Sequence, residues 1–432
     1  MVNTKSGLVL GFTALALSTA AVSGLGLYSR GQVSFASFKS NPKEIVDEVW
    51  QIVYRQYVDG TFNQVDWKAA RKEYLNKSYS NQEEAYKSIR KMLEPLKDPY
   101  TRFMDPEEFK NMQVDTSGEL TGVGIQITQD EKSKKLIVIS PIEDTPAAKA
   151  GILAKDIITK IDGKSTKGMD TNEAVSLIRG EQGSSVTLTI SRNGREQDFV
   201  IKRAKIEIHP VKFSKKQSSA GNIGYIRLNQ FSANAAKEMS EAIRKLESEK
   251  VSGYILDLRS NPGGLLFASI EIGRMWMNEG TIVSTVARSG PREKEVANGR
   301  ALTDKPLVIL VDGGSASASE ILSGALQDNK RAKLVGTKTF GKGLVQSVRP
   351  LSGGAGLAVT IAKYLTPSGR DINKTGIEPD IEVKLDDNTR QELSKDRTKI
   401  GTLSDTQYKK ALEILTKDIA EYKRRGNTRA NK

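Results

Sequence analysis

The stretch from residue 306 to residue 346 constrains the fold of this chain more than any other. Its apolar run, residues 307–311, has the length of a strand that is buried on both faces, and the sequence Asp-Gly-Gly ends it. The small residues 315–319 and then Glu320 open a helix with an apolar face. The stretch therefore predicts a strand, a tight turn, a helix, a second strand and a loop, which is typical of an α/β fold.

A serine in this turn is a candidate nucleophile, because N–H groups at a helix start are unpaired and stabilise nearby negative charge. Serine needs a base, normally histidine, and the only histidine, His209, lies among strand-forming residues beside Pro210, where we expect a structural role. Lys342 is the better candidate, since the glycines on both sides allow close backbone approach.

A lysine acts as a base only where burial or neighbouring charges bring the pKa of its amine towards the working pH. Gln346 lies on the same face as Lys342 if the segment between them is extended, and its uncharged amide could orient the amine without favouring the ammonium form. From composition alone, a serine-rich helix cap followed by a surface lysine in a glycine turn remains an open alternative.

Two segments carry a resemblance to a known family. They are GGSASASEILSGAL and GTKTFGKGLVQ, in which Lys342 follows Ser317 by 25 positions. They closely resemble the Ser-Lys centre of the carboxyl-terminal processing proteases, also called tail-specific proteases. The resemblance implies Ser317 as nucleophile, Lys342 as general base and Gln346 as the residue that positions the lysine.

The loop SNPGG, residues 260–264, is a candidate oxyanion site. Pro262 fixes the turn, and Gly263 and Gly264 expose N–H groups just before an expected helix. Similarity to the family points to the N–H of Gly263 together with that of Ala318, while the choice between the two glycines stays open. A nucleotide-phosphate site is the weaker alternative, because neither GxxxxGK[ST] nor GxGxxG occurs here.

Composition excludes several chemistries. The 432 residues include no cysteine and one histidine, so disulfides, thiolate or histidine zinc sites and a cysteine nucleophile are not expected. We predict no metal and no organic cofactor. The net charge of +14 fits a solvated surface or attraction to an anionic membrane surface. The basic residues are spread along the chain rather than clustered, so nucleic acid is not an expected partner.

The N-terminus predicts export. Lys5 precedes residues 7–28, which are 22 residues without a charge, as in a signal sequence. Residues 1–36 are therefore either a signal cleaved after Ala36 or an uncleaved N-terminal membrane anchor. The expected location is the periplasm or cell envelope, or a cyanobacterial thylakoid lumen.

A helical region is expected over residues 40–111. Asn41 and Pro42 cap a helix that runs to Tyr57, and two further helices are predicted at 67–74 and 82–93. The last part, LKDPYTRFMDPEEF, resembles the segment that leads into the PDZ domain of the protease family.

Residues 112–205 predict a small β-rich domain. Tight-turn pairs at 162–163 and 193–194 mark hairpins, and one helix is expected at 169–180. SPIEDTPAAKAGILAKDIITKIDGK resembles the middle of a PDZ domain. Arg179, at the end of the expected helix, either caps it or contacts the protease part.

The segment GVGIQI, at residues 122–127, resembles the carboxylate-binding loop of PDZ domains. The N–H groups of Gly122, Val123 and Gly124 could cradle a chain-terminal carboxylate, while the strand that begins at Ile125 adds a peptide edge to edge. Peptide binding is therefore the expected function of these four residues.

Strands and helices alternate over residues 206–390, and the resemblance implies a crotonase-like or ClpP-like protease core there. Arg370 and Asp371 fit a turn better than a reactive site. The tail, residues 391–432, predicts a helix with a capping box at Ser404 and Gln407 and an apolar seam. The seam either packs on its own chain or forms a homodimer contact.

Together these features predict an α/β protein with an inserted PDZ domain and a helical N-terminal region. The expected function is a serine endopeptidase that recognises C-terminal tails of protein substrates, membrane proteins among them, and cleaves nearby. The alternative is a catalytically silent PDZ adaptor for membrane-protein C-termini. A crotonase-type acyl-CoA enzyme is a further alternative that the export segment disfavours.

Overall fold

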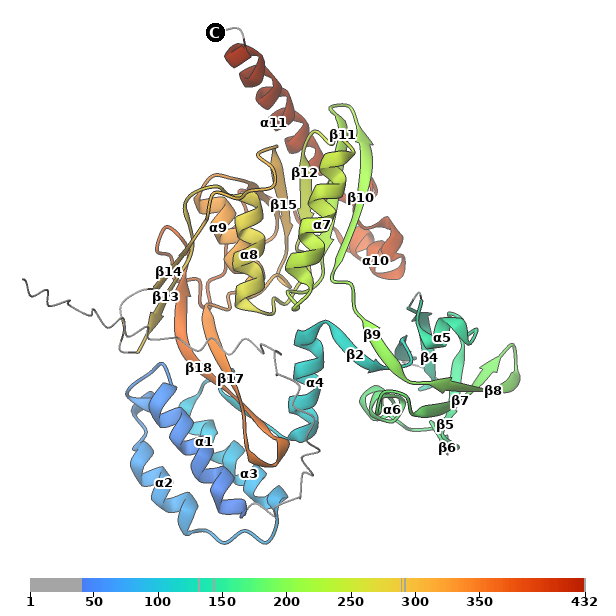
Figure 1. Cartoon of the computed structure of the whole chain (residues 1–432), viewed down its shortest axis with the longest axis vertical. Coiled ribbons are helices and arrows are strands. Elements are labelled where there is room, and N and C mark those ends of the chain that lie inside the picture. The colour runs from blue at the N-terminus through green and yellow to red at the C-terminus, as the bar shows by residue number, and fades with distance from the viewer. Residues whose placement is uncertain (1–40, 131–132, 143, 289, 291–292, 431–432) are drawn as a thin grey trace, which may run out of the picture. The chain divides into compact units, whose positions relative to one another are not determined.

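The structure is a computed structural model that describes residues 41–130, 133–142, 144–288, 290 and 293–430. The expected export segment, residues 1–36, lies outside this part of the chain. Within the part described, no helix is long and apolar enough to cross a membrane. The described residues divide into two compact units: the first holds residues 41–109 with 287, 288, 290 and 344–362, and the second holds the other described residues. Figure 1 labels their elements.

The first unit combines three helices with short strands. The helices are α1 (Pro42–Gln56), α2 (Trp67–Asn76) and α3 (Gln82–Leu93), with 3-10 turns η1 (Phe62–Gln64), η2 (Glu94–Leu96) and η3 (Ser352–Gly354). The expected cap is confirmed, because the Asn41 side chain accepts the Lys43 N–H at 3.1 Å and Pro42 opens the helix. β1 (Arg102–Met104) pairs with β18 (Gly356–Leu365), which also pairs with β17 (Leu344–Pro350).

Helix α4 (Pro106–Ser117) corrects one predicted boundary. The change from helices to strands was expected between residues 111 and 112, but that point lies inside α4. The Asp105 carboxylate accepts the N–H groups of Glu107 and Glu108 at 3.1 and 2.9 Å, which caps the helix start. After α4, the next strand therefore begins at Glu119.

The PDZ part of the second unit is an antiparallel sheet in the order β3-β4-β5-β7-β8, with β6 beside β5. Its elements are β3 (Ile125–Gln129), β4 (Leu136–Pro141), α5 (Pro146–Lys149), β5 (Ile157–Ile161), β6 (Lys164–Ser165), α6 (Thr171–Ile178), β7 (Ser185–Arg192) and β8 (Arg195–Lys202). Asn193 and Gly194 have φ of 52° and 78°, as a two-residue hairpin turn requires. The predicted turns and helix are thus present.

A two-stranded ribbon joins the PDZ part to the rest of the second unit. β2 (Glu119–Gly122) pairs antiparallel with β9 (Ala204–Glu207), and Leu120 lies opposite Ile206. The chain therefore enters and leaves this part through neighbouring strands.

The core sheet of the second unit has the order β10-β11-β12-β15-β16-β19. β10 (Val211–Ser218) is antiparallel to β11 (Gly221–Leu228), and β12 (Tyr254–Asp257), β15 (Leu307–Val311), β16 (Lys333–Gly336) and β19 (Ile381–Glu382) continue in parallel. The helices α7 (Ala235–Ser248), α8 (Leu266–Trp276) and α9 (Ala318–Asp328) belong to the crossovers, and β13 (Thr281–Ala287) pairs with β14 (Glu293–Val296). The loops after β12 and β15 meet at one sheet edge, where α/β proteins place their sites.

The tail packs on its own core sheet. α10 (Asp387–Lys395) and η4 (Arg397–Lys399) precede α11 (Thr406–Ala430). Buried side chains of α11 form one cluster with residues of β11, β12, β15 and β16: Tyr408, Ala411, Ile414, Leu415 and Ile419 with Ile223, Tyr225, Ile255, Val308, Leu310 and Val335. The apolar seam therefore has a partner within the chain.

The predicted capping box of the tail helix is wrong. Asp405, rather than Ser404, caps α11, since its carboxylate accepts the Tyr408 N–H at 3.1 Å. The Gln407 amide instead accepts from Arg259 at 2.9 Å and donates to the Val383 carbonyl at 2.8 Å. A long-range contact with Arg259 thus decides between two adjacent residues that both favour helix starts.

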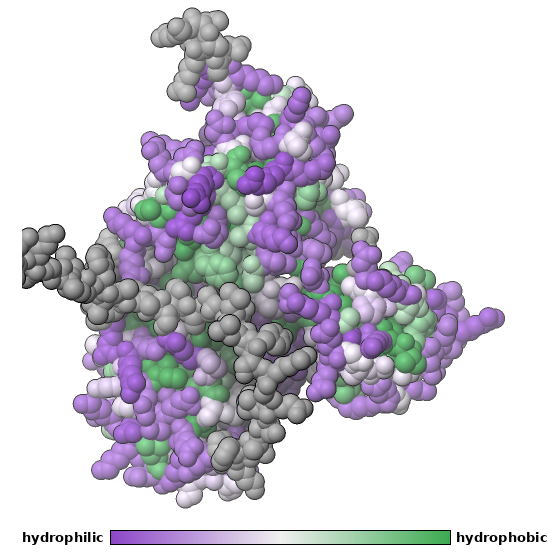
Figure 2. All heavy atoms as spheres, in the orientation of Figure 1, coloured by the Kyte–Doolittle hydropathy of each residue, from purple (hydrophilic) through white to green (hydrophobic). Residues whose placement is uncertain are grey.

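Hydrophilic residues cover most of the face shown in Figure 2. Apolar patches interrupt them, including on the PDZ part. The exposed large apolar side chains of that part are Ile139, Leu153 and Val200. This distribution agrees with a largely solvated surface for the basic chain.

Candidate active site

Ser317 lies on the turn between β15 and α9 in a backbone conformation that side chains rarely adopt. Its φ is 54° and its ψ is −113°. Such a conformation costs about 1–3 kcal/mol and persists only where the surroundings enforce it. The Asn261 carbonyl supplies part of that enforcement, since it accepts the Ala316 N–H at 3.0 Å and the Ser319 hydroxyl at 2.9 Å. The turn that carries Ser317 and the SNPGG loop are therefore joined by hydrogen bonds.

Glu320 is the residue around which this site is built. The sequence indicated only that it opens a helix. Its side chain is fully buried. The carboxylate accepts four donors: the N–H of Ser317 at 2.9 Å, the N–H of Gly341 at 2.7 Å, the N–H of Lys342 at 2.9 Å and the hydroxyl of Thr339 at 2.6 Å. Several charge-assisted hydrogen bonds are what a buried carboxylate needs to offset its lost hydration. One side chain thus anchors the backbone of both Ser317 and Lys342.

Gly263 packs directly against the turn that carries Ser317. A Cβ at this position would lie 2.9 Å from both the Ser317 Cβ and the Ala318 nitrogen, and φ is 99°. Only glycine therefore fits here. The structure brings together the two residues that the resemblance assigned to the oxyanion hole.

The two expected oxyanion donors differ in their hydrogen bonds. The Ala318 N–H opens α9, and it has no hydrogen-bond acceptor among the residues described. The Gly263 N–H instead donates to the Asn261 side-chain oxygen at 2.9 Å. Of the two N–H groups, only that of Gly263 is therefore engaged by another described residue.

Gln346 lies in β17 and belongs to the first unit. Its amide donates to the Thr360 hydroxyl at 3.4 Å. Its role towards Lys342 stays a prediction.

His209 has a local partner that accounts for its presence. Its Nδ1 lies 2.8 Å from the Glu238 carboxylate of α7, and its side chain is 65% exposed. This contact agrees with the structural role expected for the residue. The turn expected at Arg370 and Asp371 is also present, with Arg370 paired to Asp328 and Asp371 accepting the Asn373 N–H at 2.9 Å.

A buried ion network lies directly before the SNPGG loop, and sequence reasoning did not find it. Arg259 donates to Asp257 at 2.6 Å and to Asp405 at 2.7 Å, and Tyr225 donates to Asp257 at 2.7 Å. Burial opposes the charge on Asp257, but the charge and hydrogen bonds of Arg259 outweigh it and lower the pKa of Asp257 below its ordinary value. The network ties the tail to the end of β12.

The loop at residues 122–125 requires glycine at position 124 and is held by a hydrogen bond to α5. Gly124 has a φ of 81°, and a Cβ there would lie 2.3 Å from the Thr145 Cβ. The carbonyl of buried Val123 accepts the Ala147 N–H at 2.8 Å, which holds the loop against α5. Gly122 ends β2, and Ile125 begins β3, which is an edge strand of its sheet.

Arg179 caps its helix, as one of the two expectations had it, and its printed side-chain contact is with α4 rather than with the protease part. Its N–H caps α6 by donating to the Val175 carbonyl at 2.9 Å. Its guanidinium donates to the Asn111 side chain on α4 at 2.7 Å. The side chain therefore links the PDZ part to the helix that precedes it.

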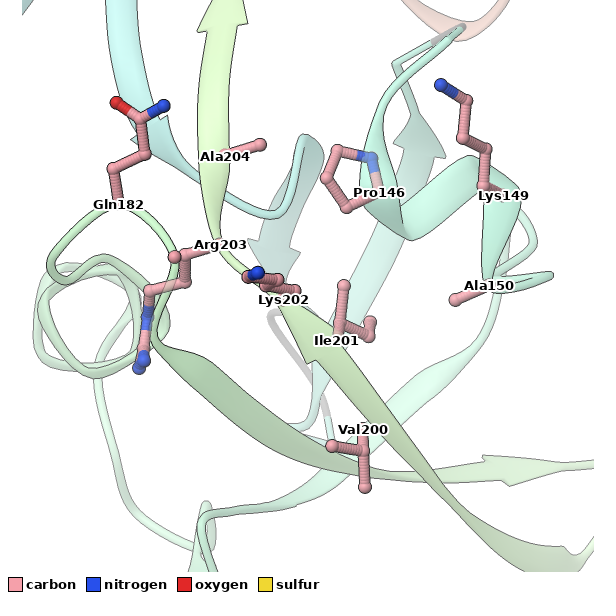
Figure 3. A pocket seen from close by; sticks show the side chains of 10 residues that line it. Pro146, Lys149, Ala150, Gln182, Val200, Ile201, Lys202, Arg203 and Ala204 are labelled. Atoms are coloured by element: carbon pink, nitrogen blue, oxygen red, sulfur yellow. The ribbon is translucent and has the colours of Figure 1, made fainter.

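A separate pocket of about 460 Å³ lies on the PDZ part, between α5 and the end of β8 (Figure 3). Pro146, Ala150, Val200 and Ile201 supply apolar lining. None of the loop residues 122–125 lines it, so this pocket is distinct from the expected carboxylate site.

Comparison with known proteins agrees with this architecture. The model of peptidase family S41 matches residues 222–383, and a PDZ domain model matches residues 137–192. The chain is 46% identical to the carboxyl-terminal-processing protease of Synechocystis sp. over 412 residues, which cover 95% of this chain and 94% of that protein. It is 39% identical to the chloroplastic C-terminal processing peptidase of Tetradesmus obliquus, over 78% of this chain and 76% of that protein.

Among solved structures, a photosystem II D1 C-terminal processing protease is similar with a TM-score of 0.55 and 38% identity, over 80% of this chain and 94% of that one. The fold and the matched domains define a PDZ-containing serine peptidase of the α/β class. The chain belongs to peptidase family S41, among the carboxyl-terminal-processing proteases.

Proposed function

We propose that the chain is an exported endopeptidase that binds the C-terminal tail of a protein substrate through its PDZ domain and cleaves nearby with a Ser317–Lys342 pair. The observation that carries this proposal is the Glu320 carboxylate, which accepts the backbone N–H of both residues at 2.9 Å. A buried charge of this kind holds a loop to a nucleophile turn, which is what a two-residue reactive centre requires.

The reaction proceeds in two halves. The neutral amine of Lys342 takes the proton of the Ser317 hydroxyl while the oxygen attacks the scissile carbonyl carbon. The Lys342 ammonium then gives the proton to the leaving amine, and an acyl-enzyme forms. Water, deprotonated by the same amine, attacks the ester, and Ser317 regains its proton as the new carboxyl end leaves. The Gln346 amide orients the lysine.

The oxyanion is held by backbone donors. The Ala318 N–H faces no competing acceptor among the described residues, so it supplies the first hydrogen bond. The Gly263 N–H supplies the second after it turns away from the Asn261 side chain. Substrate binding thus completes the oxyanion hole.

The PDZ domain positions the substrate. The loop N–H groups at 122–124 hold the terminal carboxylate, and the free edge of β3 pairs with the tail, which raises the local concentration of the scissile bond. We place the limits of this domain at the ribbon, residues 119–207, between a helical region and the protease core. The helical region then ends with α4 at Ser117, and the protease core covers residues 208–390.

We propose export to the envelope or to a thylakoid lumen, on the basis of the uncharged N-terminal run and of relatives from Synechocystis sp. and from a chloroplast. The structure with the TM-score of 0.55 is that of a protease for the C-terminus of photosystem II D1. A C-terminal extension of a membrane protein is therefore the substrate class we propose.

The test uses the full chain, its Ser317→Ala variant and a Ser323→Ala control, given a protein with an unstructured C-terminal tail. Ser323 is buried in the same helix, and its hydroxyl has no hydrogen-bond partner among the described residues. We expect wild type and Ser323→Ala to release a C-terminal fragment by mass spectrometry, and Ser317→Ala to bind the tail without cutting. Equal cleavage by all three, or none by wild type, would instead favour the adaptor.

A further inference from the structure

The hydroxyl of Tyr364 lies against the carbonyl groups of both residues of the proposed reactive pair. It donates to the Lys342 carbonyl, and its oxygen lies 3.2 Å from the Ser317 carbonyl oxygen. Tyr364 is a buried residue of β18, and its own N–H donates to the Gly343 carbonyl at 3.1 Å. The residue therefore contacts the lysine segment through both its backbone and its side chain.

Tyr364 and Glu320 contact opposite sides of the backbone of the same two residues, Ser317 and Lys342. Glu320 accepts the N–H groups of Ser317 and Lys342, and Tyr364 contacts their carbonyl oxygens. A phenol has a single proton to donate, so the Lys342 carbonyl receives it while the Ser317 carbonyl lies alongside. The backbone of Lys342 is thus held from both sides.

The lysine segment needs such restraint because glycine flanks Lys342 on each side. Gly341 has a φ of 93°, and glycine backbones have wide conformational freedom. A reactive group must be held to about 0.5 Å of its productive position. Without an anchor, the flexible segment would not hold the Lys342 amine at a fixed position relative to Ser317.

We infer that Tyr364 is a positioning residue, which sets the place of the Lys342 amine relative to the Ser317 hydroxyl. The inference rests on the proposed function. Tyr364→Phe keeps the ring and leaves the Lys342 carbonyl without its donor. We expect kcat to fall about 10- to 100-fold, because small misplacements at a reacting centre have effects of this size, and KM for a tailed substrate to stay unchanged.

The pH profile separates positioning from a loss of general stability. Only a neutral lysine takes up the serine proton, so kcat rises with pH. The pKa of an amine depends on its surroundings, so displacement of the segment should shift the rising limb in Tyr364→Phe.

The experiment compares three variants of the full chain with wild type. They are Tyr364→Phe, a chain with 4-aminophenylalanine at position 364, and Tyr254→Phe as control. The amino group restores a neutral donor at the same place. Tyr254 is also buried, and its hydroxyl donates to Glu247 at 2.6 Å. It is the first residue of β12, at the end of the strand away from the SNPGG loop. Melting temperature, kcat, KM and the pH profile are measured for each.

The inference holds if Tyr364→Phe loses kcat with a shifted profile, 4-aminophenylalanine restores most of the rate, and Tyr254→Phe resembles wild type. It is overturned if Tyr364→Phe matches wild type, or if a folded 4-aminophenylalanine chain is as slow as Tyr364→Phe. Should Tyr364→Phe fail to fold, the kcat of the 4-aminophenylalanine chain decides alone. A kcat close to that of wild type supports the inference, and a depressed kcat in a folded chain overturns it.

A fluorophosphonate that labels reactive serines distinguishes this result from a failure of the proposed function. Wild type that neither cleaves the tail nor takes up the label at Ser317 contradicts the proposed function. Wild type that does both, with an unaffected Tyr364→Phe variant, contradicts the role of Tyr364 alone.

Discussion

The carboxylate of Glu320 accepts the backbone N–H of Lys342 at 2.9 Å, across 22 positions of the sequence. Glu320 lies in the first turn of the helix that Ser317 opens. The segment that carries the lysine is therefore attached to the nucleophile helix itself, and motion of one displaces the other.

Glu320→Gln should impair both stability and activity. The amide replaces one acceptor oxygen with an NH2 group that faces backbone donors, and an unsatisfied buried donor costs about 1–3 kcal/mol. We expect urea unfolding at lower concentration and a loss of kcat of at least about 10-fold for a tailed substrate. Glu279→Gln, at an exposed position, is the control and should match wild type. Unchanged kcat in a stable Glu320→Gln variant would contradict the anchoring role.

Lys342→Ala should abolish turnover and leave tail binding intact, because the base is lost while the PDZ loop is untouched. Lys338→Ala removes an exposed lysine of the same segment, paired with Glu378, and should be active. Wild-type rate should rise with pH through the weakly alkaline range, as the neutral amine is the active form. Cleavage by Lys342→Ala would remove lysine from the base role and return attention to His209.

Asp257→Asn should destabilise the chain at neutral pH by about 3–5 kcal/mol, because it removes one partner of buried Arg259. The folded-state pKa of Asp257 lies below its ordinary value of 3.8, since Arg259 outweighs the effect of burial. The contribution is therefore complete above about pH 4 and is lost as the pH falls through the lower folded-state pKa. Urea unfolding at several pH values should show wild type and variant converging in acid. A constant difference between them would count against this assignment.

Leu415→Ala tests the packing of the tail helix. Leu415 is fully buried against the core sheet, so its truncation should cost about 2–5 kcal/mol in thermal or urea unfolding. Lys417→Ala, on the exposed side of α11, is the control. If the seam were a dimer contact instead, the loss would vary with protein concentration.

Gly124→Ala should weaken tail binding without altering the serine. The new methyl group would meet Thr145 in a backbone region that alanine avoids, so the loop must shift. We expect a raised KM for tailed substrates and wild-type fluorophosphonate labelling of Ser317. Gly163→Ala, with a φ of 78° and no atom within 4 Å of the added Cβ, shares the backbone strain without the clash. Equal KM values in the two variants would exclude the loop as the binding site.

Local signals in the sequence predicted much of the fold. The Asn41-Pro42 cap, the turn at 193–194 and the apolar strand at 307–311 each depend on neighbours in the chain, and each is present. The start of the tail helix shows where such reasoning ends. Ser404 and Asp405 are both suitable caps, and the distant Arg259 donates a hydrogen bond to the second, which caps the helix.

The residues that hold the backbone of the site could not be predicted either, because their contacts are with residues distant in the sequence. Glu320 resembles any helix-opening acidic residue, and its bonds to Gly341 and Lys342 arise from the chain topology. Tyr364 is one of several strand tyrosines. Family resemblance identifies residues with distinctive chemistry, such as Ser317, more readily than those that hold a backbone in place.

The β2–β9 ribbon has a consequence for how this protein can change over evolutionary time. The inserted domain begins and ends in two strands that pair with each other, so its attachment requires only this one strand pair. A different binding domain could therefore replace it while the protease core kept its structure. This form of attachment would let substrate choice and catalysis evolve independently of each other.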